Sequence, residues 1–199
     1  MFEVICNSSD DSFFEYRMGR IRTAQQKENG ATGFTIDIIA SNNDTKFIFK
    51  IDISNNTLIF PEAVNSEIKS SFGADRINVL TYSIEQIVAE KLETCLDRGE
   101  LNGRFRDFID IILIWKENRN LLDISLLSKT LYIISKDRNT LHNLEIYHTL
   151  FGELKESTIF VSNFARYLKS NLLFFEPRTI LEETEKMCES IIENQSENR

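Results

Sequence analysis

The sequence predicts an α+β protein in which a small sheet, within residues 1–80, is followed by a helical region over residues 81–199. Two observations lead to this prediction. Runs of β-branched and aromatic residues fill the N-terminal third, whereas most of the remaining chain repeats its apolar residues at helical spacing. We therefore expect a sheet-rich domain and a helical domain, with a boundary near residue 80.

The clearest sheet element is a hairpin. Residues 33–40 (GFTIDIIA) and 46–53 (KFIFKIDI) are strand-like, and the residues between them, SNNDT, favour a turn. Because side chains alternate along a strand, Asp52 points away from the most apolar face of the second strand. Residues 16–24 predict another strand and residues 2–6 a weaker one, and everything after the hairpin is expected to be helical.

The helical region begins with a capping signal. Ser83 followed three residues later by Gln86 is the pattern of a capping box, and apolar residues at helical spacing follow until Gly99. A second helix is expected over residues 102–116, and its segment RFRDFIDIILIW is apolar almost all round, which indicates a buried helix. Further helices are predicted over residues 123–135, 143–154, 157–171 and 177–195.

Composition and charge exclude several classes of protein. The formal net charge of −8 argues against a protein that coats nucleic acid through bulk positive charge. The 3 cysteines lie far apart and form no CxxC pair, so we expect a reducing compartment and no zinc site. The sequence shows neither a signal peptide nor an apolar run long enough to cross a membrane, and we therefore expect a cytoplasmic protein.

One lysine falls where helical spacing predicts an apolar residue. Lys91 lies within the stripe that contains Val88 and Cys95. On the next helix, Asp110 stands among apolar neighbours, and an unpaired buried carboxylate costs several kcal/mol. Lys91 is the candidate partner of Asp110, whereas Asp107 at the helix start is expected to be exposed. A lysine in such a stripe can equally extend its ammonium to water, and the sequence leaves both interpretations open.

Residues 81–111, TYSIEQIVAEKLETCLDRGELNGRFRDFIDI, resemble the AbiEii/AbiGii toxin family, the nucleotidyltransferase-like proteins of bacterial toxin–antitoxin pairs. In that family a helix that ends in AEK is followed by an R-x-[KR]-D-x-x-D segment. The earlier FKIDIS resembles the strand on which the family places a carboxylate. The resemblance is specific over 81–111, looser over 1–80 and nearly absent beyond residue 123.

The resemblance implies a role for each matching residue. Asp52 matches the family's third metal-associated carboxylate and would contact Mg²⁺, and with Lys91 and Asp110 it would form the catalytic group. The cluster that would line the nucleotide side of the cleft and bind a nucleoside triphosphate comprises Lys91, Arg104, Arg106 and Asp107. An antitoxin protein and an RNA acceptor are the partners that the resemblance implies.

The family's first catalytic segment has no counterpart ahead of Asp52. Such proteins open with a Gly-Gly-Ser/Thr turn and a helix, followed by a strand with an Asp-x-Asp pair, and we expect this chain to begin after that segment. Asp10 and Asp11 are poor substitutes because adjacent strand residues point to opposite faces, and Asp37 lies on the preceding strand. A single carboxylate cannot hold the pair of cations that nucleotidyl transfer requires.

Two functions from different classes are therefore predicted, and whether the chain is an enzyme stays open. The first is a truncated AbiEii-type toxin component that transfers a nucleotide from a nucleoside triphosphate to RNA or protein, inactive alone or completed by another polypeptide. The second is a catalytically degenerate module that binds a partner protein or a nucleotide. Under the first, Asp52, Lys91 and Asp110 are expected to converge on one cleft.

Overall fold

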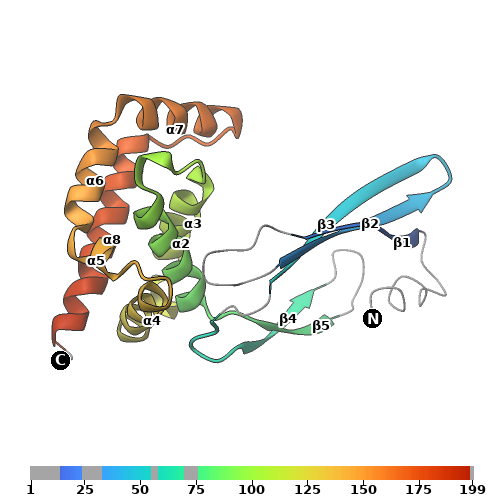
Figure 1. Ribbon diagram of the computed structural model, residues 1–199, viewed down its shortest axis with the longest axis horizontal. Helices are drawn as coiled ribbons and strands as arrows, with labels where there is room; N and C mark the ends of the chain where they lie inside the picture. Colours follow the sequence, from blue (N-terminus) through green and yellow to red (C-terminus); the bar gives the residue numbers. More distant parts are fainter. Residues whose placement is uncertain (1–13, 24–32, 55–57, 70–75, 198–199) are drawn as a thin grey trace. The chain divides into compact units, whose positions relative to one another are not determined.

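The computed structural model describes residues 14–23, 33–54, 58–69 and 76–197 (Figure 1). By its internal contacts the chain divides into two compact units, Met1–Thr57 and Leu58–Arg199. We describe each unit by itself. Within the described residues, no helix is both long enough and apolar enough to cross a membrane.

The unit Met1–Thr57 contains an antiparallel sheet of three strands in the order β1-β2-β3 (Figure 1). Its strands are β1 (Glu15–Thr23), β2 (Gly33–Asn42) and β3 (Thr45–Ser54). Strands β2 and β3 pair without interruption, and Asn43 in the turn has a positive φ of 45°, which asparagine tolerates. The predicted hairpin and the predicted strand over residues 16–24 are thus confirmed, while the strand predicted over residues 2–6 lies outside the described residues.

The prediction that the chain is entirely helical after this hairpin is wrong. Strands β4 (Val64–Lys69) and β5 (Arg76–Thr81) form an antiparallel ribbon in the unit Leu58–Arg199. Each strand has only 6 residues, most of them exposed. Their sequences therefore lack the clear alternation of apolar and polar residues that predicts a half-buried strand. The change from strand to helix falls between Thr81 and Ile84, and the domain boundary near residue 80 stays a prediction.

The rest of this unit is helical, which confirms the α+β class with a helical C-terminal region. The elements are α2 (Ile84–Arg98), η1 (Gly99–Leu101), α3 (Phe105–Asn118), η2 (Arg119–Leu121), α4 (Ile124–Asp137), α5 (Leu141–Glu145), α6 (Tyr147–Glu156), α7 (Thr158–Ser170) and α8 (Pro177–Glu197). Each helix predicted from the sequence is present. The segment predicted as one helix over residues 143–154 is divided into α5 and α6 at Ile146.

Side-chain caps explain where several helices begin. The Ser83 hydroxyl accepts a hydrogen bond from the backbone N–H of Gln86 in α2 at 3.1 Å. The Asp123 and Ser157 side chains cap α4 and α7 in the same way. The Gln86 side chain does not complete a capping box. Its amide nitrogen donates instead to the Leu58 carbonyl at 2.9 Å, which attaches the start of this unit to α2.

The core of the unit Leu58–Arg199 is one cluster of buried apolar side chains. Its largest fully buried members include Phe108 of α3, Phe151 of α6 and Phe164 of α7. Helix α8 packs against α3, α4 and α6, and α7 lies across the ends of α6 and α8 (Figure 1). Helix α2 packs against α3 and α4, so α2 and α3 are held side by side by the same core.

The apolar sequence of α3 suggested a helix that is buried all round. This prediction is wrong. Its buried residues are Phe108, Ile109, Ile111 and Ile112, whereas the Leu113 side chain is exposed. The helix therefore has an inner face and an outer one. The charged residues of its first turns lie where α3 faces the middle of α2, which brings them within reach of Lys91.

Candidate functional site

The Lys91 ammonium joins two carboxylates of the neighbouring helix. Lys91 Nζ donates to Asp107 Oδ1 at 2.7 Å and to Asp110 Oδ2 at 2.9 Å. Asp107 and Asp110 are three residues apart, so helical geometry places both on the same side of α3. Arg106 Nε lies 3.6 Å from Asp110 Oδ2. The predicted pairing of Lys91 with Asp110 is confirmed, and we call these four residues, Lys91, Arg106, Asp107 and Asp110, the Lys91 cluster.

Exposure differs among the members of this cluster. The side chains of Lys91, Asp107 and Asp110 are 24%, 14% and 28% exposed. The expectation that Asp107 is an exposed helix-start carboxylate is therefore wrong, because Asp107 is the more buried of the two acids. The Lys91 ammonium is held between the helices and does not extend freely to water, which settles the two interpretations that the sequence left open.

The protonation state of Lys91 follows from two opposing effects. Burial lowers the pKa of Lys91. The hydrogen bonds to Asp107 and Asp110 and the negative charges of these two acids together raise it by more, so the pKa of Lys91 lies above the usual lysine value. The side chain is thus an ammonium at neutral pH. An ammonium has three N–H donors, and two of them point to the carboxylates, so the third has no partner among the described residues and can serve a ligand.

The nearest sulfur does not add a nucleophile to the Lys91 cluster. Cys95 lies one helical turn after Lys91 and is fully buried. Burial raises the pKa of the Cys95 thiol well above its usual value, Asp107 raises it further, and Lys91 and the Asn102 amide oppose the rise only in part. The thiol stays protonated, so the chemistry of the cluster is electrostatic.

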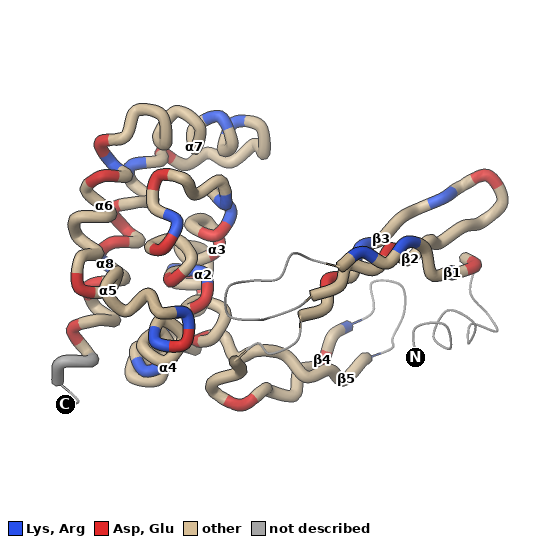
Figure 2. Tube along the Cα trace, viewed as in Figure 1, with Lys and Arg blue, Asp and Glu red and all other residues tan. Residues whose placement is uncertain are grey.

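Two arginines stand at the start of α3, Arg104 next to the Lys91 cluster and Arg106 within it. The Arg106 side chain is 79% exposed, and the backbone N–H of Arg104 donates to Asn102 Oδ1 at 2.8 Å. No carboxylate lies within ion-pair distance of the exposed Arg104 side chain in the described parts of the chain. Figure 2 shows basic and acidic positions next to one another in this region. Both guanidinium groups can therefore bind an oxyanion from the solvent side.

Asp52 belongs to the other unit. It is exposed on β3 and accepts a hydrogen bond from Thr35 Oγ1 of β2 at 2.7 Å. The register pairs Thr35 with Asp52 and places both on the face opposite Ile36 and Ile51, as alternation along the strand predicted. The Lys91 cluster lies in the unit Leu58–Arg199, so the convergence of Asp52 with Lys91 and Asp110 stays a prediction.

The described residues do not fit a magnesium site by themselves. No group of three or more Asp, Glu, His or Cys side chains suited to a metal ion is present among them. Asp37, which shares a face with Asp52, forms an ion pair with Arg22 and pairs in register with Lys50. Mg²⁺ prefers several oxygen ligands and would meet competing cations here. Asp10 and Asp11, the other carboxylates considered from the sequence, lie outside the described residues.

A comparison with protein families identifies the family of the chain. A family model described as nucleotidyl transferase AbiEii toxin, type IV toxin–antitoxin system, matches residues 2–193. The chain belongs to the AbiEii family. The match extends well beyond residue 123, where the sequence alone showed almost no resemblance, so α4 to α8 belong to the family's architecture. Comparisons with curated proteins and with solved structures gave no match.

One feature of this AbiEii protein was not foreseen from its sequence. Gln86, Glu90 and Glu93 form a polar line on α2, and the buried Glu93 carboxylate pairs with Arg138 and accepts a hydrogen bond from Thr140 Oγ1 at 2.9 Å. Their spacing of four and three residues on an apolar helix was the available signal. These three residues anchor the face of α2 that lies opposite Lys91. They therefore help to set the orientation of the helix that carries Lys91.

Proposed function

We propose that the AbiEii chain supplies the nucleotide-binding part of a nucleotidyltransferase site and that it transfers no nucleotide by itself. The observation that carries this proposal is the charged ammonium of Lys91, held at the α2–α3 contact with one N–H donor that has no partner in the described part of the chain. Arg104 and Arg106 add two guanidinium groups at the start of α3. Together they form a cationic site for the phosphates of a nucleoside triphosphate.

Binding of phosphate would change the pairing within the Lys91 cluster. Asp110 is the more exposed carboxylate and lies at the longer distance from Lys91 Nζ. A phosphate oxygen near Lys91 therefore displaces Asp110 more readily than Asp107. Asp107 keeps the ammonium in place, and Arg106, already near Asp110, can turn its remaining N–H groups to the same phosphate.

Asp52 would provide one carboxylate toward the reacting phosphate. Nucleotidyl transfer uses cations held by several carboxylates, and the described donor set falls short of such a site. We therefore assign the missing carboxylates to a further polypeptide segment that is needed for turnover. In this proposal the complete site works in the cytoplasm with an RNA or protein acceptor, and an antitoxin opposes it.

The second candidate is a binding module without catalysis. The observation that favours it is that Asp37, Asp107 and Asp110, which could have served as metal ligands, are each paired with a cation. In such a module the Lys91 cluster would bind a nucleotide or a partner protein. It would do so without any need for Asp52.

A label-transfer assay tests the first proposal. Purified full chain is incubated with each of the four labelled nucleoside triphosphates, Mg²⁺ or Mn²⁺, and total RNA or protein as acceptor. We expect no metal-dependent transfer from the chain alone, and transfer after addition of a polypeptide that carries an Asp-x-Asp strand of the family. Transfer by the chain alone that disappears in Asp52→Ala but persists in Asp44→Ala would contradict the proposal.

A further inference from the structure

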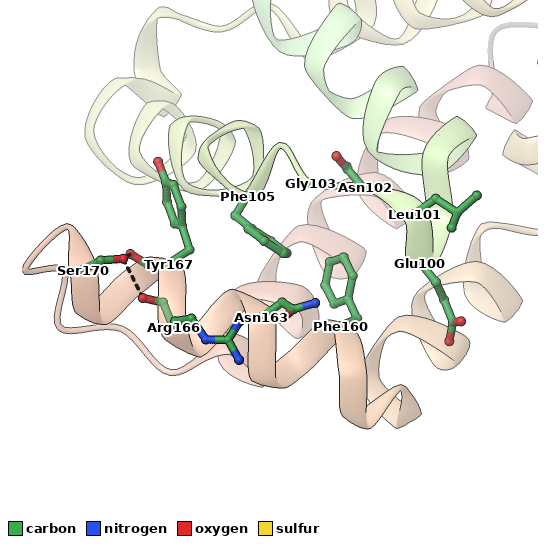
Figure 3. Close-up of a pocket in the computed structure, with 10 residues that line it drawn as sticks. All are labelled: Glu100, Leu101, Asn102, Gly103, Phe105, Phe160, Asn163, Arg166, Tyr167 and Ser170. Carbon is green, nitrogen blue, oxygen red and sulfur yellow. Dashed lines mark hydrogen bonds between the residues drawn. The ribbon is translucent and has the colours of Figure 1, made fainter.

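A pocket separate from the Lys91 cluster lies between η1, the start of α3 and α7 (Figure 3). Its volume is about 380 Å³, which falls within the range of ligand pockets. Phe105, Phe160 and Tyr167 form its aromatic wall, and Asn163 and Arg166 of α7 line it as well. No member of the Lys91 cluster is among its lining residues, so the pocket needs an account of its own.

The aromatic wall is fixed by the core beneath it. The Phe105 ring stacks on Phe164 with centroids 5.0 Å apart, and it meets Phe160 edge to face at 5.3 Å. Phe160 and Phe164 are buried, whereas Phe105 and Tyr167 are only partly covered. The pocket is therefore preformed and presents aromatic surface to a ligand at little cost in conformational entropy.

Exposed apolar side chains occur in, or next to, the chain segments that line this pocket. Among the described residues, the most exposed large apolar side chains are Phe174 (96%), Leu101 (92%), Leu172 (78%) and Ile159 (76%). Leu101 lines the pocket, and Ile159 precedes the lining residue Phe160. Leu172 and Phe174 follow Ser170, which lines the pocket at the end of α7. Exposed apolar residues in the segments that form a concave site are typical of a protein-binding surface.

The charge of α7 complements an acidic ligand. Its only charged residues are Arg166 and Lys169, and Figure 2 shows these basic positions in its last turns. Neither has a carboxylate within ion-pair distance in the described structure. Asn163 Oδ1 accepts a hydrogen bond from Arg166 Nη1 at 3.2 Å, which orients the guanidinium beside the pocket (Figure 3). Glu100, at the η1 end, is the acidic residue of the lining.

We propose that this pocket binds a peptide segment of a partner protein in which a large apolar side chain is followed by carboxylates. The apolar side chain packs against the exposed parts of Phe105 and Tyr167 and against Leu101, and the carboxylates lie toward Arg166 and Lys169, away from Glu100. A single strand of RNA could also stack on aromatic rings. The exposed aliphatic side chains of Leu101, Ile159 and Leu172 cannot stack with bases, but they can pack against apolar side chains of a peptide. They therefore favour a peptide as the ligand.

Peptide display tests this proposal directly. A library of random peptides of about a dozen residues is selected against the immobilised full chain, and the enriched sequence is synthesised with a fluorescent label. We expect enrichment of peptides that combine Leu or Phe with Asp or Glu. Fluorescence anisotropy should show binding about tenfold weaker in Arg166→Glu and in Leu101→Ser, as expected for loss of a charge-assisted hydrogen bond or an apolar contact.

Two further variants separate this pocket from general charge effects. Glu100→Lys should bind the acidic peptide as tightly as the unaltered chain or more tightly, and Arg178→Glu, a matched control on α8, should not change its affinity. Enrichment of basic peptides, no enrichment, or unchanged binding in Arg166→Glu would overturn the proposal. Displacement of the peptide by a labelled single-stranded RNA whose binding needs Arg166 would assign the pocket to nucleic acid instead.

Discussion

The two units of the chain differ in how completely they bury their apolar residues. In Leu58–Arg199, α2, α3, α7 and α8 share a core in which rings such as Phe108 and Phe164 are fully buried. Among the described residues of Met1–Thr57, the buried cluster contains Ile36 and Ile38, and much of the apolar face of the sheet is exposed, including Phe49 at 52%. A sheet of three strands offers little area for burial.

This difference bears on the candidate site. Lys91 is presented by a helix that packs mainly on α3 and α4 and carries a fixed polar line on its far side. Asp52 is presented by a thin sheet and accepts a hydrogen bond from Thr35. We therefore expect the Lys91 cluster to keep its geometry under mild perturbation, and the position of Asp52 to depend on what packs against the sheet.

The largest expected effect comes from truncation of one buried ring in each unit. Phe108→Ala should lower the free energy of unfolding by about 3–5 kcal/mol, because it removes a fully buried side chain and leaves a cavity. Phe49→Ala should lower it by about 1 kcal/mol or less, because half of that side chain is already in water. Chemical denaturation followed by Trp115 fluorescence measures the first loss, and hydrogen exchange of the β2 and β3 amides measures the second. Equal losses would show that the sheet has a core as complete as that of the helices.

A smaller effect distinguishes the two acids of the Lys91 cluster. Asp107→Ala should lower the free energy of unfolding by about 1–2 kcal/mol, and Asp110→Ala by less, because Asp107 is the more buried and the closer to Lys91. The matched control is Asp97→Ala, an exposed acid of α2, which should change stability by about 0.5 kcal/mol or less. A larger loss in Asp110→Ala than in Asp107→Ala would contradict the observed difference in burial.

The sequence predicted elements well wherever composition, turn residues or caps leave a local signal. The hairpin of β2 and β3 was foreseen from its β-branched and aromatic runs and its turn residues, and the start of α2 was foreseen from Ser83. The strands β4 and β5 were missed because both are short and exposed. The break at Ile146 was also missed, since neither glycine nor proline marks it.

For the candidate site, the sequence predicted which residues are in contact but not how deeply they are buried. Helical spacing and the cost of an unpaired charge led from Lys91 to Asp110, and that pair is present. The burial of Asp107 depends on how closely α3 approaches α2, which no local pattern encodes. The pocket beside Arg166 was missed for the same reason, because it arises where α7 crosses the start of α3. The relation of Asp52 to Lys91 stays a prediction.

Binding of a nucleoside triphosphate to the full chain tests the central claim most directly, that Lys91 is a phosphate-binding residue. Titration calorimetry at low ionic strength should detect binding that weakens as salt is added, as expected for charge attraction to phosphate. Lys91→Ala should weaken the affinity by about tenfold or more, whereas Lys116→Ala, which removes an exposed lysine of α3 paired with Glu183, should leave it unchanged. Equal affinities in Lys91→Ala and the unaltered chain would show that Lys91 only holds α2 and α3 together, and would contradict the account.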